Sequence, residues 1–446
     1  MKEPFLTGKP CRTYGGIRVP HKKLTAAEET VTLPITLKVV IPMQMHIGAP
    51  SAPTVAVGDR VLVGDKIGEA VGPLGVPVHA SVSGTVTAVG PVRVGGGATV
   101  TAVTIESDGK MEPAAFAPPT VTDRTSFLAA VRESGLVGLG GAGFPTYKKL
   151  DVPSGKTVDT LLINAAECEP YLTGDHRGML EDPWSVMSGI YAVKQALGIP
   201  RAILCVEANK PDAIALLKQM ADSSADTDDS VRLLTLRTSY PQGAEKVLIR
   251  AATGREVPKG GLPADAGCIV LNVTGAAAIA RYLKTGEPLT AKRLTVSGSA
   301  VLHPQNVLVP IGTPVSEVLS FCGLKEEPKK VLFGGPMMGT ALDDLDVPIV
   351  KNNNGITAMG AKEARISEPI ACIRCGRCVH ACPMRLSPLD LANATAAQDT
   401  EALAALELMS CMECGCCSYS CPAHRPLTQS MRLGKALLRA ATSKKN

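Results

Sequence analysis

The chain has 446 residues, of which 45% are hydrophobic, 20% are charged and 3% are aromatic, and its formal net charge is +5. This length exceeds a single hydrophobic core and predicts about three domains. The modest charge without a long basic block argues against nucleic-acid binding. No apolar run approaches the roughly 18 residues of a membrane span, and the N-terminus lacks the apolar core of a signal peptide. We therefore expect the chain to stay on the side of the membrane where it is made.

The N-terminal part of the chain is predicted to be an irregular extension followed by a β module. Residues 1–30 are polar and irregular, and residues 31–118 contain short β-forming runs separated by Gly and Pro. The stretches VAVGDRVLVGDKIGEA (55–70) and VPVHASVSGTVTAVG (76–90) resemble the repeats of lipoyl and biotinyl carrier domains, which have a barrel-sandwich fold. A carrier needs a lysine at its hairpin tip, but residues 79–84 read HASVSG. We therefore predict a structural module without a swinging arm, and we interpret His46 and His79 as packed or surface histidines.

Residues 119–290 alternate predicted strands and amphipathic helices. A helix is expected over 124–136, followed by a glycine-rich segment. Strands are then expected at 159–164, 201–206, 231–236 and 267–273, with helices near 185–197, 211–221, 242–252 and 274–283. Strands that alternate with helices of this length predict a multidomain α/β protein with a parallel sheet covered on both faces.

The C-terminal third is predicted to hold two further domains. Residues 291–365 return to short β runs with a helix near 314–322, which indicates a small β-grasp domain of the SLBB type. Residues 366–434 are mostly helical, with a helix start at Ser387 and Pro388, and nine of the 14 cysteines lie between Cys372 and Cys421. Residues 435–446 are predicted to form a basic tail.

Two cysteine runs predict a pair of iron–sulfur clusters. Residues 372–383 and 411–422 share the spacing C-x2-C-x2-C-x3-C-P. In such runs three thiolates bind one cubane and the fourth binds the other cubane. We therefore assign one [4Fe–4S] cluster (cluster 1) to Cys372, Cys375, Cys378 and Cys421, and the second (cluster 2) to Cys382, Cys411, Cys414 and Cys417. Zinc is the alternative metal for C-x2-C pairs, and we interpret Cys416 as a bystander thiol.

The segment GLGGAGFPT (138–146) raises the question of a dinucleotide fingerprint. It contains G-x-G-x-x-G at Gly138, Gly140 and Gly143. A Rossmann fingerprint follows a strand, opens a helix and is followed about 20 residues later by an acidic residue. Here a helix is predicted before the loop, Pro145 interrupts it, and no Asp or Glu ends a second strand at the expected distance. We therefore predict a different glycine-rich loop, whose backbone N–H groups suit a phosphate or a flat ring.

Polar residues follow three of the predicted strands. Because the carboxyl ends of parallel strands form the ligand crevice of open α/β sheets, we predict a binding site there; ordinary βα connections are the alternative. The residues concerned are Asn164, Glu167 and Glu169 after the first strand, Tyr240, Gly243 and Glu245 after the third, and Asn272 and Thr274 after the fourth.

At these residues the chain resembles a known family. GLVGLGGAGFPTYKKL, NAAECEP and SYPQGAEKVL resemble the flavin- and NADH-binding core shared by the flavoprotein subunit of respiratory complex I and the C subunit of the Rnf complex. The order of the domains resembles the Rnf C subunit over nearly the whole chain. The Rnf complex is a membrane assembly that exchanges electrons between ferredoxin and NAD and couples this exchange to Na⁺ or H⁺ transport, and its C subunit is the peripheral NAD(H)-reactive one.

The resemblance implies cofactors, partners and site residues. It implies FMN on the loop residues Gly138, Gly140, Gly141, Ala142 and Gly143, lined by Lys149, Asn164, Glu167, Tyr240, Gly243 and Asn272. It implies that NADH contacts Phe144 by stacking and Glu169 and Glu245 through its hydroxyls. The implied partners are the other Rnf subunits, including a ferredoxin-like iron–sulfur subunit, at the cytoplasmic face of the bacterial membrane. The chain departs from the complex I pattern at Ala166, Cys168 and Ala244, and Lys149 is preferred over Lys148 on alignment register alone.

The predicted mechanism is hydride transfer between NAD(H) and the flavin, followed by single-electron transfer through the two clusters, with no catalytic acid–base residue. One alternative is a cobalamin reductase of bacterial microcompartments, a family that begins near the glycine loop. Another is a non-enzymatic electron-relay docking subunit, which Ala166 and Ala244 would favour.

The last segment of the chain carries an apolar stripe with a gap. Leu427, Met431 and Leu438 lie on one helical face, and Gly434 interrupts it. The segment would either dock on membrane subunits or the bilayer surface, or pack as a terminal helix on the cluster domain; we favour the terminal helix.

Overall fold

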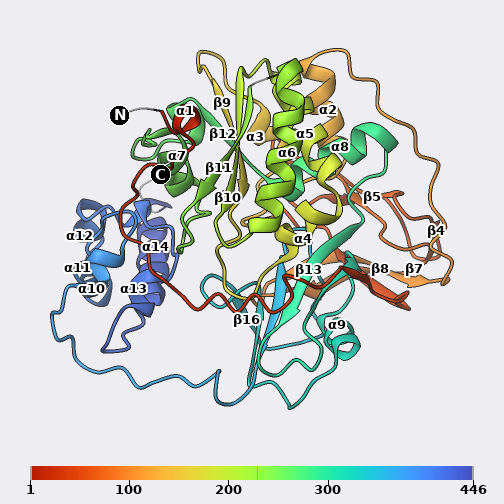
Figure 1. Cartoon of the computed structure of the whole chain (residues 1–446). Helices are drawn as coiled ribbons and strands as arrows, with labels where there is room; N and C mark the ends of the chain where they lie inside the picture. Colours follow the sequence, from red (N-terminus) through yellow and green to blue (C-terminus); the bar gives the residue numbers. More distant parts are fainter. Residues whose placement is uncertain (1–2, 229, 444–446) are drawn as a thin grey trace.

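The computed structural model describes residues 3–228 and 230–443. In Figure 1 a parallel sheet with its helices lies at the top, a β module lies at the right, a mixed sheet lies below, and the cysteine-rich helices lie at the left. Within the described residues, the helices are too short or too polar to span a membrane.

The N-terminal β module consists of two antiparallel sheets. Its strands are β2 (Lys38–Pro42), β3 (Ala52–Pro53), β4 (Arg60–Val61), β5 (Lys66–Glu69), β6 (Val78–His79), β7 (Gly84–Arg93) and β8 (Thr99–Ser107). One sheet has the order β2-β8-β7-β4 and the other β3-β5-β6. Alternate residues of β2 and β8, among them Val39, Ile41, Val103 and Ile105, point into a shared core. This is the predicted barrel-sandwich arrangement.

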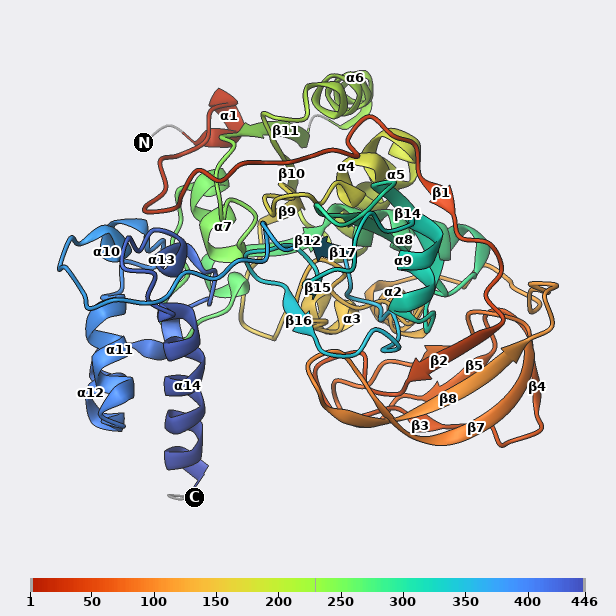
Figure 2. The same cartoon turned by 90° about the horizontal axis from the view of Figure 1, so that it is seen from below.

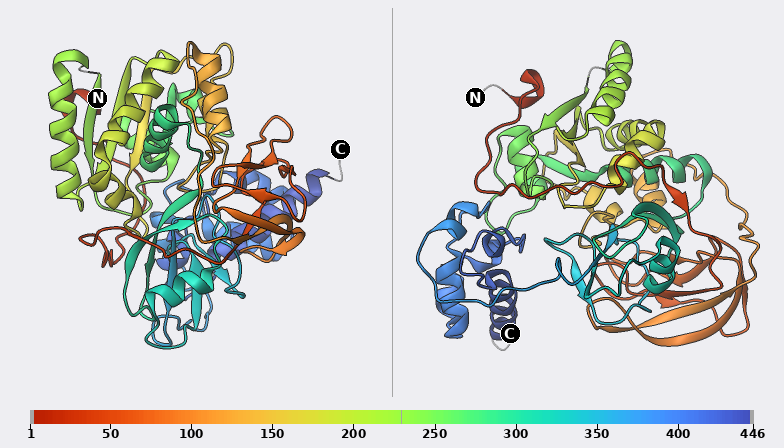
Figure 3. Two further views of the ribbon diagram at one scale, coloured as in Figure 1. Left: turned by 90° about the vertical axis from the view of Figure 1, so that its right-hand side faces the viewer. Right: turned by 60° about the horizontal axis from the view of Figure 1, so that its bottom comes forward.

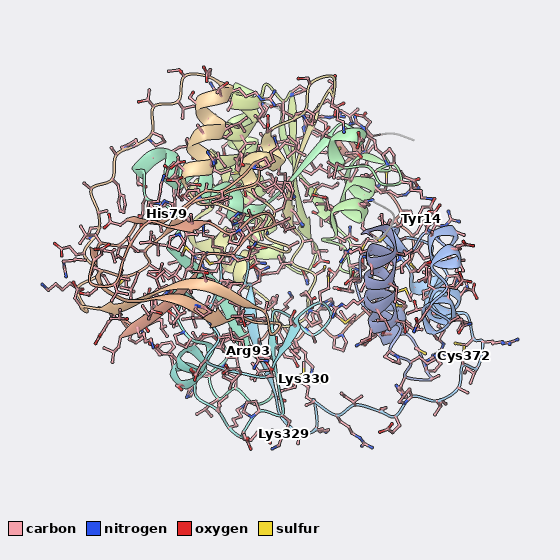
Figure 4. All side chains as sticks on the ribbon, turned by 180° about the vertical axis from the view of Figure 1, so that it is seen from behind. Tyr14, His79, Arg93, Lys329, Lys330 and Cys372 are labelled. Atoms are coloured by element: carbon pink, nitrogen blue, oxygen red, sulfur yellow. The ribbon has the colours of Figure 1, made fainter. Side chains whose placement is uncertain are left out.

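The turn that replaces the lysine-bearing tip of a carrier domain is buried. Ala80, Ser81 and Val82 are shielded from solvent, and the Ser81 hydroxyl donates a hydrogen bond to the carbonyl of Ile311, which directly follows a strand of the mixed sheet. His79 is 6% exposed and His46 is 7% exposed, so both are packed histidines. Figure 4 shows His79 where the β module meets the α/β domain. A turn covered in this way has no room for a swinging arm.

The α/β domain contains a four-stranded parallel sheet with the order β11-β10-β9-β12. Its strands, each within one residue of the predicted bounds, are β9 (Thr160–Ala165), β10 (Arg201–Glu207), β11 (Val231–Leu236) and β12 (Cys268–Asn272). Its helices are α2 (Arg124–Glu133), α3 (Thr146–Leu150), α4 (Gly174–Glu181), α5 (Pro183–Leu197), α6 (Pro211–Asp228), α7 (Glu245–Thr253) and α8 (Val273–Thr285), with a 3₁₀ turn η1 (Pro263–Ala266). Leu161 and Leu162 of β9 enter different hydrophobic clusters, so both faces of the sheet are covered.

Helices α5 and α8 cross closely at Gly189. A Cβ atom built there would lie 1.9 Å from the carbonyl oxygen of Ala276. We expect Gly189→Ala to force the helices apart and to lower the free energy of unfolding by about 1–3 kcal/mol, measured as a lower thermal midpoint. Gly275→Ala is the control, because its nearest contact is an ordinary 3.4 Å to Leu271. Equal losses in both variants would contradict the close crossing.

The mixed sheet below the α/β domain has six strands in the order β1-β14-β13-β17-β15-β16. Its elements are β1 (Val31–Thr32), β13 (Ala291–Ser297), β14 (Gln305–Pro310), α9 (Val315–Cys322), β15 (Lys330–Phe333), β16 (Thr340–Leu342) and β17 (Gly355–Met359). Strand β1 falls within the range predicted for the barrel-sandwich module, but it pairs in parallel with β14. A strand of only two residues is too short to show a hydrophobic periodicity, so the available sheet edge determines where β1 pairs.

The cysteine-rich domain is helical. It contains α10 (Arg377–Ala381), α11 (Pro388–Ala396), α12 (Thr400–Ala405), η2 (Leu408–Ser410), α13 (Cys416–Tyr419) and α14 (Leu427–Ser443). Figure 2 shows α11, α12 and α14 side by side. A Cβ atom on Gly434 would lie 2.6 Å from the Thr395 hydroxyl, so the gap in the apolar stripe is where α14 approaches α11. Leu427 and Met431 are buried in this contact, as expected for a terminal helix.

The predicted basic tail does not begin at residue 435. Helix α14 continues to Ser443, and residues 444–446 lie outside the described residues. Lys435 is buried, and its Nζ donates to the Cys411 carbonyl at 2.6 Å and to Glu413 at 2.8 Å. The aliphatic stem of a lysine packs readily against a domain while its charge finds a partner, which sequence patterning does not reveal.

Residues 1–30 do not form a separate unit. After α1 (Pro4–Thr7) the segment runs extended across the molecule, from the α/β domain past the cysteine-rich domain to the mixed sheet (Figure 3).

Candidate flavin and iron–sulfur sites

The glycine-rich loop is an exposed excursion between α2 and α3 with a closed base. The Gly138 amide donates to the Phe144 carbonyl at 2.8 Å, and Val137 pairs with Pro145 in an antiparallel bridge. A helix precedes the loop, so the context of a Rossmann fingerprint is absent, as predicted. Gly140 and Gly141 are exposed, and within the described chain no atom lies within 4 Å of a Cβ built on Gly141. The loop therefore presents bare backbone to open space.

Three of the predicted site residues meet beside this loop. Asn164 and Asn272 are register partners at the ends of β9 and β12, and Asn164 Nδ2 donates to the Gly243 carbonyl at 2.8 Å. A Cβ atom on Gly140 would lie 3.2 Å from Asn272 Nδ2. The sequence brings them together because parallel strands end at the same edge of the sheet.

A charged pair closes one side of the site. Lys149 of α3 lies 2.9 Å from Glu245, the first residue of α7. Neighbouring Lys148 pairs instead with Asp151 at 2.8 Å. The positive end of the α7 dipole favours the carboxylate of Glu245. Of the two neighbouring lysines, Lys149 is therefore the one beside Glu245, and its contact with FMN stays a prediction.

Two other predicted site residues use their side chains elsewhere. The Glu167 carboxylate accepts the amides of Asp175 and His176 at the start of α4, at 2.7 and 3.1 Å. Glu169 accepts the amides of Met337 and Met338 in the mixed-sheet domain, at 3.1 and 2.8 Å, and burial raises its pKa to about 7. These carboxylates hold the NAAECEP loop to its surroundings, and their contacts with FMN and NADH stay predictions.

Tyr240, whose contact with the flavin stays a prediction, lies between two domains. Its ring is buried where the α/β domain meets the cysteine-rich domain, and its hydroxyl donates to the Cys414 carbonyl at 2.8 Å. Burial strongly raises the pKa of this phenol, so it remains a donor. Phe144 is half-buried at the base of the glycine loop.

Several positioning residues were not predicted. Lys210, 2% exposed, donates to the Ala166 carbonyl at 2.6 Å, and Lys23 donates to the carbonyls of Glu167 and Glu169 at 2.8 and 2.9 Å.

A third lysine holds the glycine loop. Buried Lys292 donates to the carbonyl of Leu139 in this loop at 3.3 Å, and burial lowers the pKa of Lys292 to about 8. Lysines are usually exposed, so sequence alone offers little signal for these roles.

The eight predicted cluster cysteines line two separate cavities. Cys372, Cys375, Cys378 and Cys421 border one cavity, and Cys382, Cys411, Cys414 and Cys417 border the other. These are the crossed sets expected from the spacing. Among the described residues, no three metal-binding side chains converge on a single point suited to one ion. Cys416 also lines the second cavity, but its thiol points to the Tyr240 carbonyl. A cavity bordered by four ligand thiols suits a cluster that is itself several atoms wide.

The two cysteine runs adopt the same local backbone. Arg374 and Glu413 both have positive φ angles, 54° and 57°, and their amides point at the sulfurs of Cys372 and Cys411 at 3.4 and 3.3 Å. Amide donors to sulfur stabilise the negative charge of a cluster and tune its potential. The loops are thus already folded in a shape that suits a cluster.

The two cavities differ in exposure. Cys414 at the cluster 2 cavity is 7% exposed and packs against Tyr240. At the cluster 1 cavity, Cys375 is exposed and neighbouring Ile373 is 61% exposed. Cluster 2 therefore belongs on the side of the α/β domain and cluster 1 at the outer surface.

Comparison with known proteins agrees with this arrangement. The C subunit of the Na⁺-translocating ferredoxin:NAD⁺ oxidoreductase complex of Acetobacterium woodii is 44% identical over 97% of this chain and 98% of its own length. Its counterpart in the proton-translocating complex of Clostridium ljungdahlii is 42% identical over 82% of this chain and 80% of its own. This chain belongs to the family of Rnf C subunits.

Four domain families match successive parts of this Rnf C subunit. They are the RnfC barrel sandwich hybrid domain (residues 11–110), the Nuo51 FMN-binding domain (131–281), the SLBB domain (293–341) and the 4Fe-4S dicluster domain (364–422). The cofactors are therefore FMN and iron–sulfur clusters, and the zinc alternative is wrong. The cobalamin reductase alternative is also wrong, because a domain of the RnfC type matches residues 11–110, ahead of the glycine loop, and the relatives are Rnf C subunits.

A solved structure shares the fold of this Rnf protein. The NAD⁺-reducing [NiFe]-hydrogenase in its air-oxidised state superposes with a TM-score of 0.51 at 20% identity, over 73% of this chain and 67% of the other.

Proposed function

We propose that this chain is the peripheral NAD(H)-reactive subunit of an ion-translocating ferredoxin:NAD⁺ oxidoreductase complex, at the cytoplasmic face of the membrane. One observation carries the proposal: a glycine-loop site and two cluster cavities lie in one chain, and the buried Tyr240–Cys414 hydrogen bond joins the two regions. The names of the relatives in Acetobacterium and Clostridium support the same reaction.

The chain's own residues would position the reactants. Backbone N–H groups of the exposed residues 140–142 would face the flavin phosphate or ring, with Asn164 and Asn272 beside it at the sheet edge. When bound, FMN exchanges a hydride with NAD(H) and releases its electrons singly. The Lys149–Glu245 pair would set the charge at the rim of the site.

The exposures of the cavities support an order for the electrons. Cluster 2 would exchange with the flavin side, and cluster 1 with a partner that contacts the surface around Ile373 and Cys375. The partner would be another member of the complex, such as its ferredoxin-like iron–sulfur subunit.

The rival function is a docking subunit without redox chemistry at the nucleotide site, favoured by Ala166 and Ala244. The two functions are separated by adding NADH to cluster-reconstituted protein with FMN and following the visible absorbance. Bleaching of the flavin and then of the clusters is expected. Unchanged spectra with full FMN and iron content would leave only the docking function.

Gly141→Val tests whether the open space over the glycine loop is the flavin site. We expect the dissociation constant for FMN to rise at least about tenfold, equivalent to about 1.4 kcal/mol, without a change in the thermal midpoint of the apoprotein. Gly90→Val is the matched control, because a Cβ there also meets no described atom within 4 Å, in the β module. Equal FMN affinity in the two variants would move the flavin site away from this loop.

A further inference from the structure

The segment of residues 14–23, here called the N-terminal strap, contacts both redox regions of the chain. It leaves the α/β domain near α7, passes the cysteine-rich domain and ends at the NAAECEP loop (Figure 2). Its sequence, YGGIRVPHKK, lies within the segment predicted to be an irregular extension.

The strap begins between two arginines from different domains. The ring of Tyr14 lies 4.6 Å from the Arg250 guanidinium of α7 and 4.7 Å from that of Arg385, three residues after the cluster 2 ligand Cys382. Figure 4 shows Tyr14 beside the cysteine-rich helices. Two cations on one ring join the domains through favourable cation–π contacts.

The next three residues fit tightly against Tyr240 and against the cysteine run that borders the cluster 2 cavity. The Gly16 amide donates to the Ala381 carbonyl at 3.0 Å, and Ile17 exchanges two backbone hydrogen bonds with Tyr240, at 2.8 and 2.9 Å. A Cβ atom on Gly15 would lie 2.5 Å from the Cys382 carbonyl oxygen. Only glycine allows the backbone this close to the cluster 2 cavity.

The strap ends on the loop that follows β9. Lys23 Nζ donates to the carbonyls of Glu167, Glu169 and Leu172. One half-buried lysine with three carbonyl acceptors fixes the path of the NAAECEP loop, because its three N–H donors are all used there. The strap therefore holds the flavin-side loop and the cluster 2 side at once.

From these contacts we infer that the N-terminal strap is a positioning element for electron transfer, which holds cluster 2 at a fixed separation from the flavin site. Electron transfer between two redox centres slows steeply as their separation grows. The covalent connection to the cysteine-rich domain, residues 361–371, is largely exposed, so packing rather than the linker must set this separation. The inference rests on the flavin site proposed above.

Gly15→Ala tests the inference, with Gly8→Ala as its matched control. Both glycines have positive φ angles, 54° and 64°, so alanine is similarly strained at both, but a Cβ on Gly8 meets no described atom within 4 Å. In full-length protein reconstituted with FMN and clusters, NADH is mixed rapidly and flavin and cluster absorbance are followed separately. We expect Gly15→Ala to reduce its flavin at the wild-type rate and its clusters several-fold more slowly, and Gly8→Ala to match wild type in both.

A second measurement does not depend on turnover. Hydrogen–deuterium exchange is expected to be several-fold faster at Gly16, Ile17 and Tyr240 in Gly15→Ala, and unchanged in Gly8→Ala. Equal cluster-reduction rates and equal exchange in the two variants, with flavin reduction intact, would overturn the strap inference. Loss of flavin reduction in wild type as well would instead overturn the proposed function.

Discussion

Iron content is expected to fall by half, and not to zero, when Cys372 and Cys421 are both replaced by alanine. The two cysteines are 49 positions apart, but they border the same cavity. If each run of four cysteines bound its own cluster, this double variant would damage both clusters. In the crossed arrangement it removes cluster 1 and leaves the four ligands of cluster 2 intact.

The matched comparison is Cys372→Ala combined with Cys382→Ala. These two residues lie in one run but border different cavities, so both clusters should be lost. Iron analysis and the visible absorbance of the two double variants distinguish the arrangements, and the opposite pattern would show that each run binds its own cluster. Cys416→Ala should retain both clusters, because this thiol points to the Tyr240 carbonyl rather than completing either set of four.

Replacing Lys210 by methionine is expected to destabilise the α/β domain by about 3–5 kcal/mol at pH 8, since it leaves a buried carboxylate without its nearest cation. Lys210 Nζ lies 3.5 Å from Glu207, and these side chains are 2% and 1% exposed. The change also removes the donor to the Ala166 carbonyl. The thermal midpoint measures the loss, and FMN affinity should fall with it because Ala166 belongs to the flavin-side loop.

The loss should depend on pH in a defined direction. Burial raises the pKa of Glu207 from its ordinary 4.5 to about 7, so Glu207 contributes stability that is full below pH 4.5 and is lost as the pH rises through 7. Without Lys210 the charged form of the Glu207 carboxyl group is less favourable still. The difference between wild type and Lys210→Met should therefore be large at pH 8 and small at pH 5. A pH-independent difference would contradict this origin.

Two controls accompany this prediction. Glu207→Gln in the Lys210→Met background removes the unpaired charge and should recover part of the stability at pH 8. Lys148→Met breaks only the exposed pair with Asp151, in which both side chains are 40% exposed, and should cost less than about 1 kcal/mol.

The elements and the metal ligands could be predicted because their signals are local. Alternation of strand and helix patterns located the parallel sheet to within one residue at each strand boundary, and the cysteine spacing assigned the crossed ligand sets that border the two cavities. The helix before the glycine loop and Pro145 were enough to reject a Rossmann fingerprint. In each case the decisive residues are neighbours along the chain, so their geometry follows from backbone periodicity.

The directions of individual side chains at the site were decided by tertiary structure. Glu169 and Tyr240 follow strands, as the sequence indicates, but their polar atoms bind Met337, Met338 and Cys414 in other domains. Lys23 reaches a loop 144 positions away. A buried polar group bonds to whichever partner packing brings within about 3 Å, and periodicity along one segment contains no information about that partner.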